Sequence, residues 1–206
     1  MIKKVLNELL HQEAPGPSIS FTVFDLIKAI DLIAEKGPIG RGKLSEEMKI
    51  GGGAVRTLIK RLKNSDLVTI SKPGCSLTEK GRSVWRKITL ILPQKVRLKR
   101  NKLTSASFNS AVLVRGYSEE VKDGLEQRDA AVRVGAKGAI TIVLKNGKLV
   151  IPAVSLDLSK DYPEAFNQIT QAMNPEENDV IIIGSADDPK KAEYGALAAA
   201  WTLVRS

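Results

Sequence analysis

The chain has 206 residues, of which 43% are hydrophobic, 27% charged and 4% aromatic, as in soluble globular proteins of one or two domains. Its single cysteine, Cys75, excludes an intrachain disulfide, and with one histidine, His11, it lacks the ligands of a Cys/His zinc site. The net charge of +9 is divided into +7 over residues 1–92, +5 over 93–103 and −3 over 104–206, which predicts a polyanionic partner for the first half.

Residues 1–10 are typical of a short amphipathic helix and not of a signal peptide, because Asn7 and Glu8 interrupt the apolar positions. A break rich in proline follows at 14–20. The apolar run at 196–204 is too short to cross a bilayer. We therefore expect a cytoplasmic protein that has no membrane contact, metal or cofactor.

Two helices are predicted next. Over 22–36, apolar residues recur at three- and four-residue spacing, and Gly37-Pro38 ends the helix. Residues 40–48 predict a second, shorter helix, with Leu44 and Met48 facing inward. The glycines at 51–53 then form a turn.

The third predicted helix, 54–65, has an apolar face and a cationic face. Its core positions have helical spacing: Val55, Leu58, Ile59 and Leu62. The opposite face has no acidic residue and holds Arg56, Thr57, Lys60, Arg61, Lys63 and Asn64. Like charges on one helix face destabilise it, and bound phosphates would relieve that repulsion.

A hairpin is predicted after this helix, with strands at 67–70 and 75–77 and a tip at Lys72-Pro73-Gly74. Thr78 is then the predicted N-cap of a further helix. The apolar side of that helix holds Val84, Trp85, Ile88 and Leu92.

Three segments carry a family resemblance: LSEEM at 44–48, AVRTLIKRLKNSDLV at 54–68 and SLTEKGR at 76–82. Together they resemble the winged helix-turn-helix of MarR- and PadR-like bacterial and archaeal regulators. The whole chain is also similar to an uncharacterised archaeal family that joins such a head to a carboxyl-terminal domain of unknown function. The resemblance implies a transcriptional regulator that binds double-stranded DNA.

The resemblance also implies roles for single residues. The helix at 54–65 would enter the major groove, with Arg56 and Thr57 near the base edges. Phosphate contacts would come from the same face, the second helix and the hairpin tip. With Asn64 on that face, the implied contact residues are Arg41, Lys43, Arg56, Thr57, Lys60, Arg61, Lys63, Asn64, Ser71 and Lys72.

One departure from the family pattern concerns recognition of the DNA sequence. The recognition helix of such proteins usually opens with Ser or Thr, whereas Gly51, Gly52 and Gly53 stand here. Glycines permit close backbone approach to a phosphate. They offer no side chain to a base, so we do not expect strong sequence specificity from this turn.

The second half alternates strands and helices. Strands are predicted at 106–115, 138–144, 148–154 and 179–185, and helices at 118–133, 161–173 and 189–204. Asn146-Gly147 marks a hairpin between the two middle strands. The expected fold class is α+β: a winged helix-turn-helix domain followed by a ferredoxin-like α+β domain with an extra C-terminal helix.

An enzyme is not the expected reading of this half. It contains no phosphate-binding Gly-x4-Gly-Lys-Ser/Thr motif and no histidine or cysteine. A small anionic effector has possible donors in three arginines and a strand-to-helix turn: Arg115, Arg128, Arg133, Gly184 and Ser185. A salt-bridged surface and an ordinary N-cap explain the same residues and are preferred.

The predicted domains are a winged helix at 1–92, a basic connector at 93–104 that is partly a strand, and a ligand-binding or dimerisation domain at 105–206. A homodimer is expected because one such head makes few base contacts. Its interface is assigned to the first helix (Val5, Leu6, Leu9, Leu10) and to residues 85–92. A kinase-like enzyme with a fused winged helix, an RNA-binding protein and a protein-docking adaptor stay open as alternatives.

Overall fold

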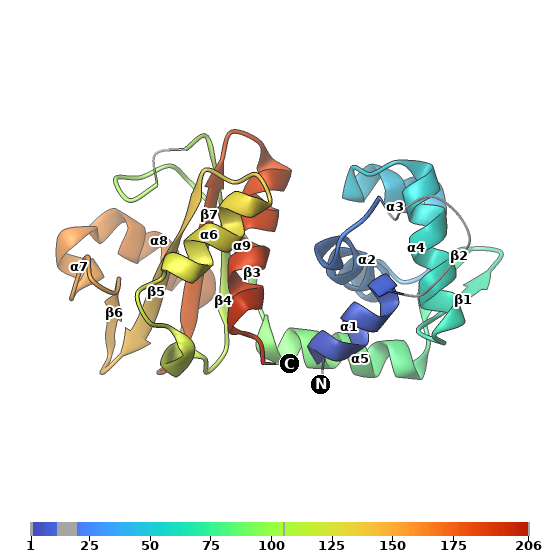
Figure 1. Cartoon of the computed structure of the whole chain (residues 1–206), viewed down its shortest axis with the longest axis horizontal. Coiled ribbons are helices and arrows are strands. Elements are labelled where there is room, and N and C mark those ends of the chain that lie inside the picture. The colour runs from blue at the N-terminus through green and yellow to red at the C-terminus, as the bar shows by residue number, and fades with distance from the viewer. Residues whose placement is uncertain (1, 12–19, 105, 206) are drawn as a thin grey trace. The chain divides into compact units, whose positions relative to one another are not determined.

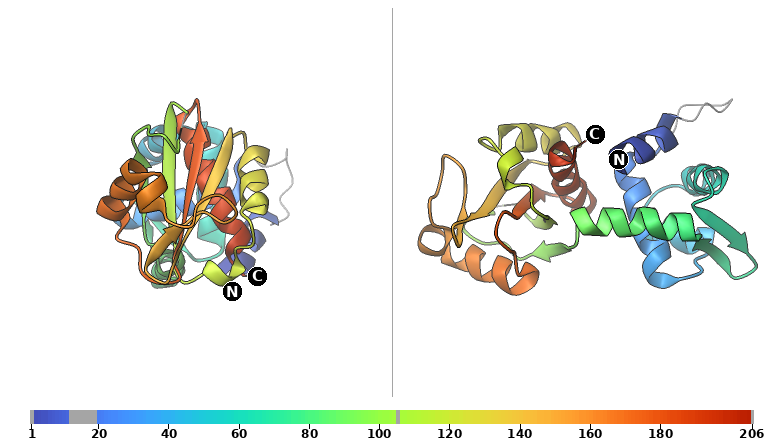
Figure 2. Two further views of the ribbon diagram at one scale, coloured as in Figure 1. Left: turned by 90° about the vertical axis from the view of Figure 1, so that its left-hand side faces the viewer. Right: turned by 90° about the horizontal axis from the view of Figure 1, so that it is seen from below.

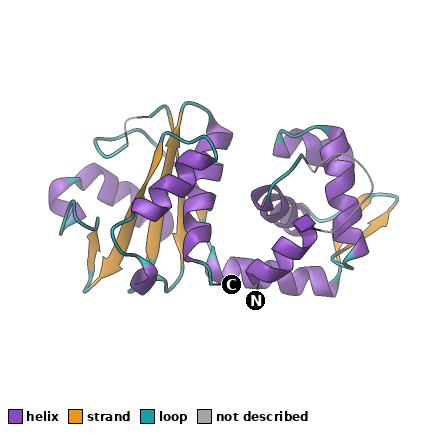
Figure 3. Cartoon of the chain, viewed as in Figure 1, coloured by secondary structure: helices purple, strands orange, loops and turns teal. Residues whose placement is uncertain are grey.

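A computed structural model describes residues 2–11, 20–104 and 106–205 (Figure 1). The chain forms two compact units that divide between Ile88 and Thr89. Helices and strands occur in both units (Figure 3). Among the described residues, no helix is both long and apolar enough to span a bilayer.

The first unit follows the predicted order of helices and hairpin. Its elements are α1 (Ile2–His11), α2 (Val23–Lys36), α3 (Arg41–Met48), α4 (Gly52–Asn64), β1 (Val68–Ser71), β2 (Gly74–Leu77) and α5 (Glu79–Ile91). The two strands pair antiparallel, and the boundary between the units falls within α5.

A capping box begins α2. The Thr22 amide donates to Asp25 Oδ2 at 2.7 Å, and the Asp25 amide donates back to Thr22 Oγ1 at 3.3 Å. The apolar stripe of α2 then meets buried residues of its neighbours. The fully buried side chains include Leu26, Ile30 and Ile33 of α2, Leu44 and Met48 of α3, and Leu58 and Leu62 of α4.

The burial of α1 corrects part of the predicted dimer interface. Leu6 is 0% exposed and Leu9 is 2% exposed, because the apolar face of α1 packs inside its own unit. These two side chains are therefore not available to a second subunit. Val5, Leu10 and Trp85 are half-buried.

The string Leu77–Gly81 has a packing explanation. A Cβ atom on Gly81 would lie 2.0 Å from the carbonyl oxygen of Leu67, so only glycine lets α5 start this close to the strand. The Gly81 amide donates to Thr78 Oγ1 at 3.0 Å, as expected of an N-cap threonine.

The second unit is built on one antiparallel five-stranded sheet in the order β3-β4-β7-β5-β6. Helices α7 and α8 cover one face, and α6 and α9 cover the other (Figure 2). The elements are β3 (Lys95–Leu98), β4 (Phe108–Val114), η1 (Ser118–Glu120), α6 (Leu125–Arg133), β5 (Gly138–Lys145), β6 (Lys148–Val150), α7 (Leu158–Asp161), α8 (Pro163–Met173), β7 (Val180–Ala186) and α9 (Pro189–Leu203).

This order differs from the predicted ferredoxin-like arrangement, although the α+β class holds. The last strand, β7, lies between β4 and β5, the two strands that α6 connects. A ferredoxin-like sheet places its third strand there. The strand expected within the basic connector is present as β3, which extends the sheet at the edge beside β4.

Three predicted elements are shorter or divided. The helix predicted at 118–133 is broken near Gly124, which has a φ of 82°, into η1 and α6. The strand predicted at 148–154 ends at Val150, because a turn around Pro152 follows. The helix predicted at 161–173 is preceded by α7, and Pro163 occupies the first turn of α8.

Candidate nucleic-acid interface

Helix α4 presents the cationic face of the first unit. It begins at Gly52, two residues before the predicted start, with Gly51 as an N-cap that makes no side-chain cap bond. Because Val55, Leu58 and Leu62 are buried, helical spacing turns Arg56, Lys60 and Lys63 outward. All three of these basic side chains are exposed.

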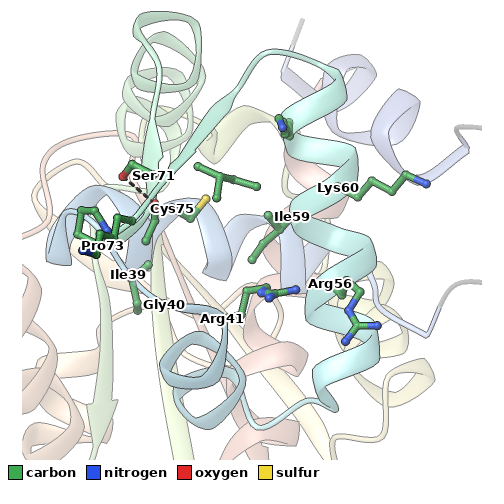
Figure 4. Close-up of a pocket in the computed structure, with 13 residues that line it drawn as sticks. Ile39, Gly40, Arg41, Arg56, Ile59, Lys60, Ser71, Pro73 and Cys75 are labelled. Carbon is green, nitrogen blue, oxygen red and sulfur yellow. Dashed lines mark hydrogen bonds between the residues drawn. The ribbon is translucent and has the colours of Figure 1, made fainter.

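A groove of about 600 Å³ lies between α4 and the β1-β2 hairpin (Figure 4). Five of its lining side chains are cationic, and none is a carboxylate. In Figure 4, Arg56 and Lys60 extend from α4, and Arg41 lies near Arg56. The lining residues are Ile39, Gly40, Arg41, Arg56, Ile59, Lys60, Lys63, Ile70, Ser71, Lys72, Pro73, Gly74 and Cys75.

The lining also includes apolar side chains that were not predicted as part of the site. Ile39, Ile59 and Cys75 are buried, whereas Ile70 is 52% exposed. The backbones of Ile39 and Cys75 exchange two hydrogen bonds of 3.0 and 2.9 Å. This pairing fixes the hairpin to the segment before α3, so the width of the groove is set by backbone contacts.

Burial also determines the chemistry of Cys75. Desolvation raises the pKa of its thiol to about 11. The group is therefore a neutral thiol at physiological pH, and a reactive thiolate is not available. Cys75 contributes to the groove as a small apolar side chain.

Arg61 does not lie on the exposed face, which corrects its predicted role as a phosphate contact. It is 7% exposed, and its Nη1 donates to the carbonyl oxygens of Leu9 at 2.7 Å and Leu10 at 2.5 Å. Its guanidinium also lies 5.7 Å from the centre of the Phe21 ring. Arg61 therefore binds the carboxyl end of α1, where carbonyl groups lack helical partners.

Three other predicted contacts lie outside the groove lining. Lys43 forms ion pairs on its own helix with Glu46 at 3.0 Å and Glu47 at 3.6 Å, and the hydrogen bond to Glu46 raises the pKa of Lys43. Thr57 Oγ1 donates to the carbonyl of Gly53 at 3.2 Å. Asn64 is exposed at the end of α4.

The residues proposed for an anionic effector are not brought together. Arg115 follows β4 at one end of the sheet, whereas Gly184 and Ser185 pair with Ser110 and Asn109 at the other, about 17–20 Å away at strand spacing. Arg115 forms ion pairs with the buried Asp179 at 2.9 Å and with Glu176 at 3.0 Å.

The remaining effector candidates have structural partners or lie apart. The Arg128 guanidinium pairs with Asp129 at 3.2 Å, and Arg133 is exposed at the end of α6. A Cβ atom on Gly184 would lie 2.4 Å from backbone atoms of α9, so this glycine serves helix packing. Ser185 Oγ donates to Asn109 Oδ1 at 2.7 Å.

The N-terminus of α9 is already capped by the protein. The Lys191 amide donates to Asp188 Oδ1 at 2.9 Å, which places a carboxylate where an anionic ligand would bind. Among the residues that the structure describes, no three His, Cys, Asp or Glu side chains gather in a way that could hold a metal ion.

Comparisons with known proteins agree with a two-part chain. Residues 22–83 match the family model described as "PH0730-like, N-terminal domain", and residues 105–203 match a domain of unknown function, DUF4443. A solved structure, the hypothetical protein PH0730 from Pyrococcus horikoshii OT3, is 31% identical with a TM-score of 0.72. The match covers 89% of this chain and 93% of that chain. A search of the curated proteins finds no match.

Proposed function

The chain belongs to the family of the hypothetical protein PH0730, and we propose that its first unit is a winged helix that binds double-stranded DNA. The groove between α4 and the hairpin carries this proposal. Five cationic side chains and no carboxylate line it: Arg41, Arg56, Lys60, Lys63 and Lys72. In this account the protein is a transcriptional regulator whose α4 enters the major groove and whose hairpin is the wing.

Electrostatics favours a polyanion as the ligand of this surface. Bringing cations together on one side of a helix is unfavourable in the free protein, and phosphate groups with matching spacing remove that repulsion. Duplex DNA supplies such a row of phosphates, and its major groove admits an α-helix. A groove for a partner protein is expected to be poorer in lysine.

Phosphate contacts, more than base contacts, are expected to supply the affinity. The first turn of α4 contains Gly52 and Gly53, with Gly51 as the N-cap, so no side chain there reaches a base edge. Arg56 is the nearest groove-lining residue of α4 with a side chain suited to guanine. We therefore expect binding to many sequences, with a modest preference set mainly by Arg56.

The proposal is tested by fluorescence anisotropy with a labelled random-sequence duplex across a salt series. The test variant is Arg56→Ala/Lys60→Ala/Lys63→Ala. The control, Lys122→Ala/Lys160→Ala/Lys191→Ala, removes three exposed cations of the second unit and changes the net charge equally. Each lost phosphate contact reduces the slope of log affinity against log salt by about 0.9. Over the tenfold change from 1 M to 0.1 M salt, this corresponds to an affinity about eightfold lower than that of the wild type at 0.1 M.

We expect the test variant to lose between about 1.8 and 2.7 units of slope, for two or three lost contacts, and the control to match wild type. Equal losses of slope in the two variants would show that the effect comes from net charge alone, and would reject the groove as the DNA-binding surface. Absence of binding by the wild type at low salt would reject DNA as its ligand.

A further inference from the structure

We infer that the second unit carries its own DNA-phosphate contact, formed by the edge strand β3 and the turn after it. Four exposed cations mark this surface: Arg97, Lys99, Arg100 and Lys102, here called the β3 surface. It lies outside the groove of the first unit. The choice of duplex DNA over another polyanion rests on the proposed function, because the surface is tethered to a unit proposed to bind DNA.

The stretch of sequence that contains this surface carries charges of one sign only. Residues 80–118 contain ten Lys or Arg and no Asp or Glu. Globular surfaces usually mix both signs of charge. Helix α8 contains one carboxylate, Glu164. Among the described residues, no ion pair joins Arg97, Lys99, Arg100 or Lys102 to Glu164 or to another carboxylate. The four cations are therefore available to an external anion.

The turn that carries these cations is held in place by buried polar groups. Asn101 is 8% exposed and Thr104 is 1% exposed. Asn101 Oδ1 accepts from the amides of Leu103 at 2.9 Å and Thr104 at 3.1 Å. Its Nδ2 donates to Gln168 Oε1 on α8 at 3.2 Å, which ties the turn to the body of the unit.

Apolar anchors lie at both ends of the same turn. Leu98 belongs to the core between the sheet and α8, and Leu103 packs against it. The backbone of the turn is thus fixed before any ligand arrives, and its lysine and arginine side chains extend from a rigid base. Preorganisation of this kind lowers the entropy cost of binding, so the surface is suited to a repeated row of phosphates.

Strand pairing keeps the surface at the sheet edge. In β3, Val96 and Leu98 pack toward α8, so alternation turns Arg97 to the other face. Arg97 pairs with Ser110 of β4, and no strand among the described residues pairs with the outer side of β3. Cations on such an edge also discourage pairing with another chain, but that role does not require the anchored turn that follows.

The test compares three variants with wild type on a labelled duplex of about three helical turns, on the order of 30 base pairs. The first variant is Arg97→Ala/Lys99→Ala/Arg100→Ala/Lys102→Ala, and the second is the groove variant Arg56→Ala/Lys60→Ala/Lys63→Ala. The third is a charge-matched control with four exposed cations of the second unit replaced: Lys122→Ala, Arg133→Ala, Lys160→Ala and Lys191→Ala. Thermal unfolding verifies that each variant is folded.

We expect the β3-surface variant to lose about 1.8 to 3.6 units of salt slope, for two to four contacts, and at least about 50-fold in affinity at 0.1 M salt, while the control retains both. A β3-surface variant that binds like the control overturns the inference, even if the groove variant is impaired. If the groove variant binds like wild type and the β3-surface variant does not, the proposed function of the groove fails and this inference stands. A loss confined to a hairpin RNA of equal phosphate count, with duplex binding unchanged, also overturns it.

Discussion

Replacement of Arg61 by methionine should weaken the first unit without changing its salt-dependent DNA binding. The guanidinium donates to the carbonyls of Leu9 and Leu10 and lies against Phe21. Methionine keeps much of the buried aliphatic chain but removes both hydrogen bonds. Hydrogen bonds from a charged donor contribute about 1.5–3 kcal/mol each, but water can reach part of the freed helix end. We therefore expect a total loss of about 2–3 kcal/mol.

For a unit of this size, that loss lowers the melting temperature by about 10–20 °C. The assay is thermal unfolding followed by Trp85 fluorescence in a Trp201→Phe background, which restricts the signal to the first unit. Lys60→Ala is the paired variant: it should leave the melting temperature unchanged and flatten the DNA salt slope by about 0.9. If Arg61→Met instead leaves stability intact and flattens the slope, Arg61 contacts phosphate and does not hold the end of α1.

Three further predictions concern packing and ionisation. Gly81→Ala should destabilise the first unit by about 3 kcal/mol, since its Cβ would lie 2.0 Å from Leu67 O. Gly53→Ala should instead stabilise it by about 0.5–1 kcal/mol, because a Cβ there has nothing within 4 Å. Urea unfolding compares the two variants. Gly184→Ala should destabilise the second unit, because its Cβ would lie 2.4 Å from α9; a stability equal to wild type in calorimetry would contradict this packing. The pKa of Cys75 is raised from 9.0 to about 11 on folding, so the folded state retains a proton that the unfolded state loses. The free energy of unfolding should therefore fall between pH 9 and 11. A Cys75→Ala variant that shows the same fall would exclude the thiol as its cause.

Local patterns predicted most elements of the first unit. The apolar spacing in α2 and α4, the Gly37-Pro38 stop and the Thr78 cap all depend on residues within a few positions of one another. The outward direction of Arg56, Lys60 and Lys63 follows from the same spacing, once Val55, Leu58 and Leu62 form the core. These are the features that a single sequence can specify without knowledge of distant contacts.

The position of Arg61 shows where such reasoning fails. Arg61 borders the apolar stripe of α4, so periodicity alone allows it to be exposed or buried. Its burial is decided by the end of α1 and by Phe21, which lie 51 to 52 residues and 40 residues away in the chain. Neither contact has a local sequence signal. The apolar lining of the groove was missed for the same reason, since Ile39 and Cys75 meet only through long-range strand pairing.

In the second unit, the elements were largely predictable and their arrangement was not. Alternation identified β4, the Asn146-Gly147 signal identified β5, and a continuous apolar run identified β7. No local pattern places β7 between β4 and β5. Some errors had a visible signal: Gly124 breaks the helix predicted at 118–133, and Pro152 ends the strand predicted at 148–154. The sheet order needed the three-dimensional packing of α6 and α9 against one face.

Binding of duplex DNA by α4 and the hairpin can be observed without any substitution, by NMR titration of the isotope-labelled chain. Amide shifts are recorded as an unlabelled random-sequence duplex is added. We expect shifts to gather over residues 52–64 and 68–77, beside those of the β3 surface, while α9 amides at 189–203 stay unchanged. Saturation with duplex that leaves 52–64 and 68–77 unperturbed, or shifts confined to other residues, would rule out DNA binding by α4 and the hairpin.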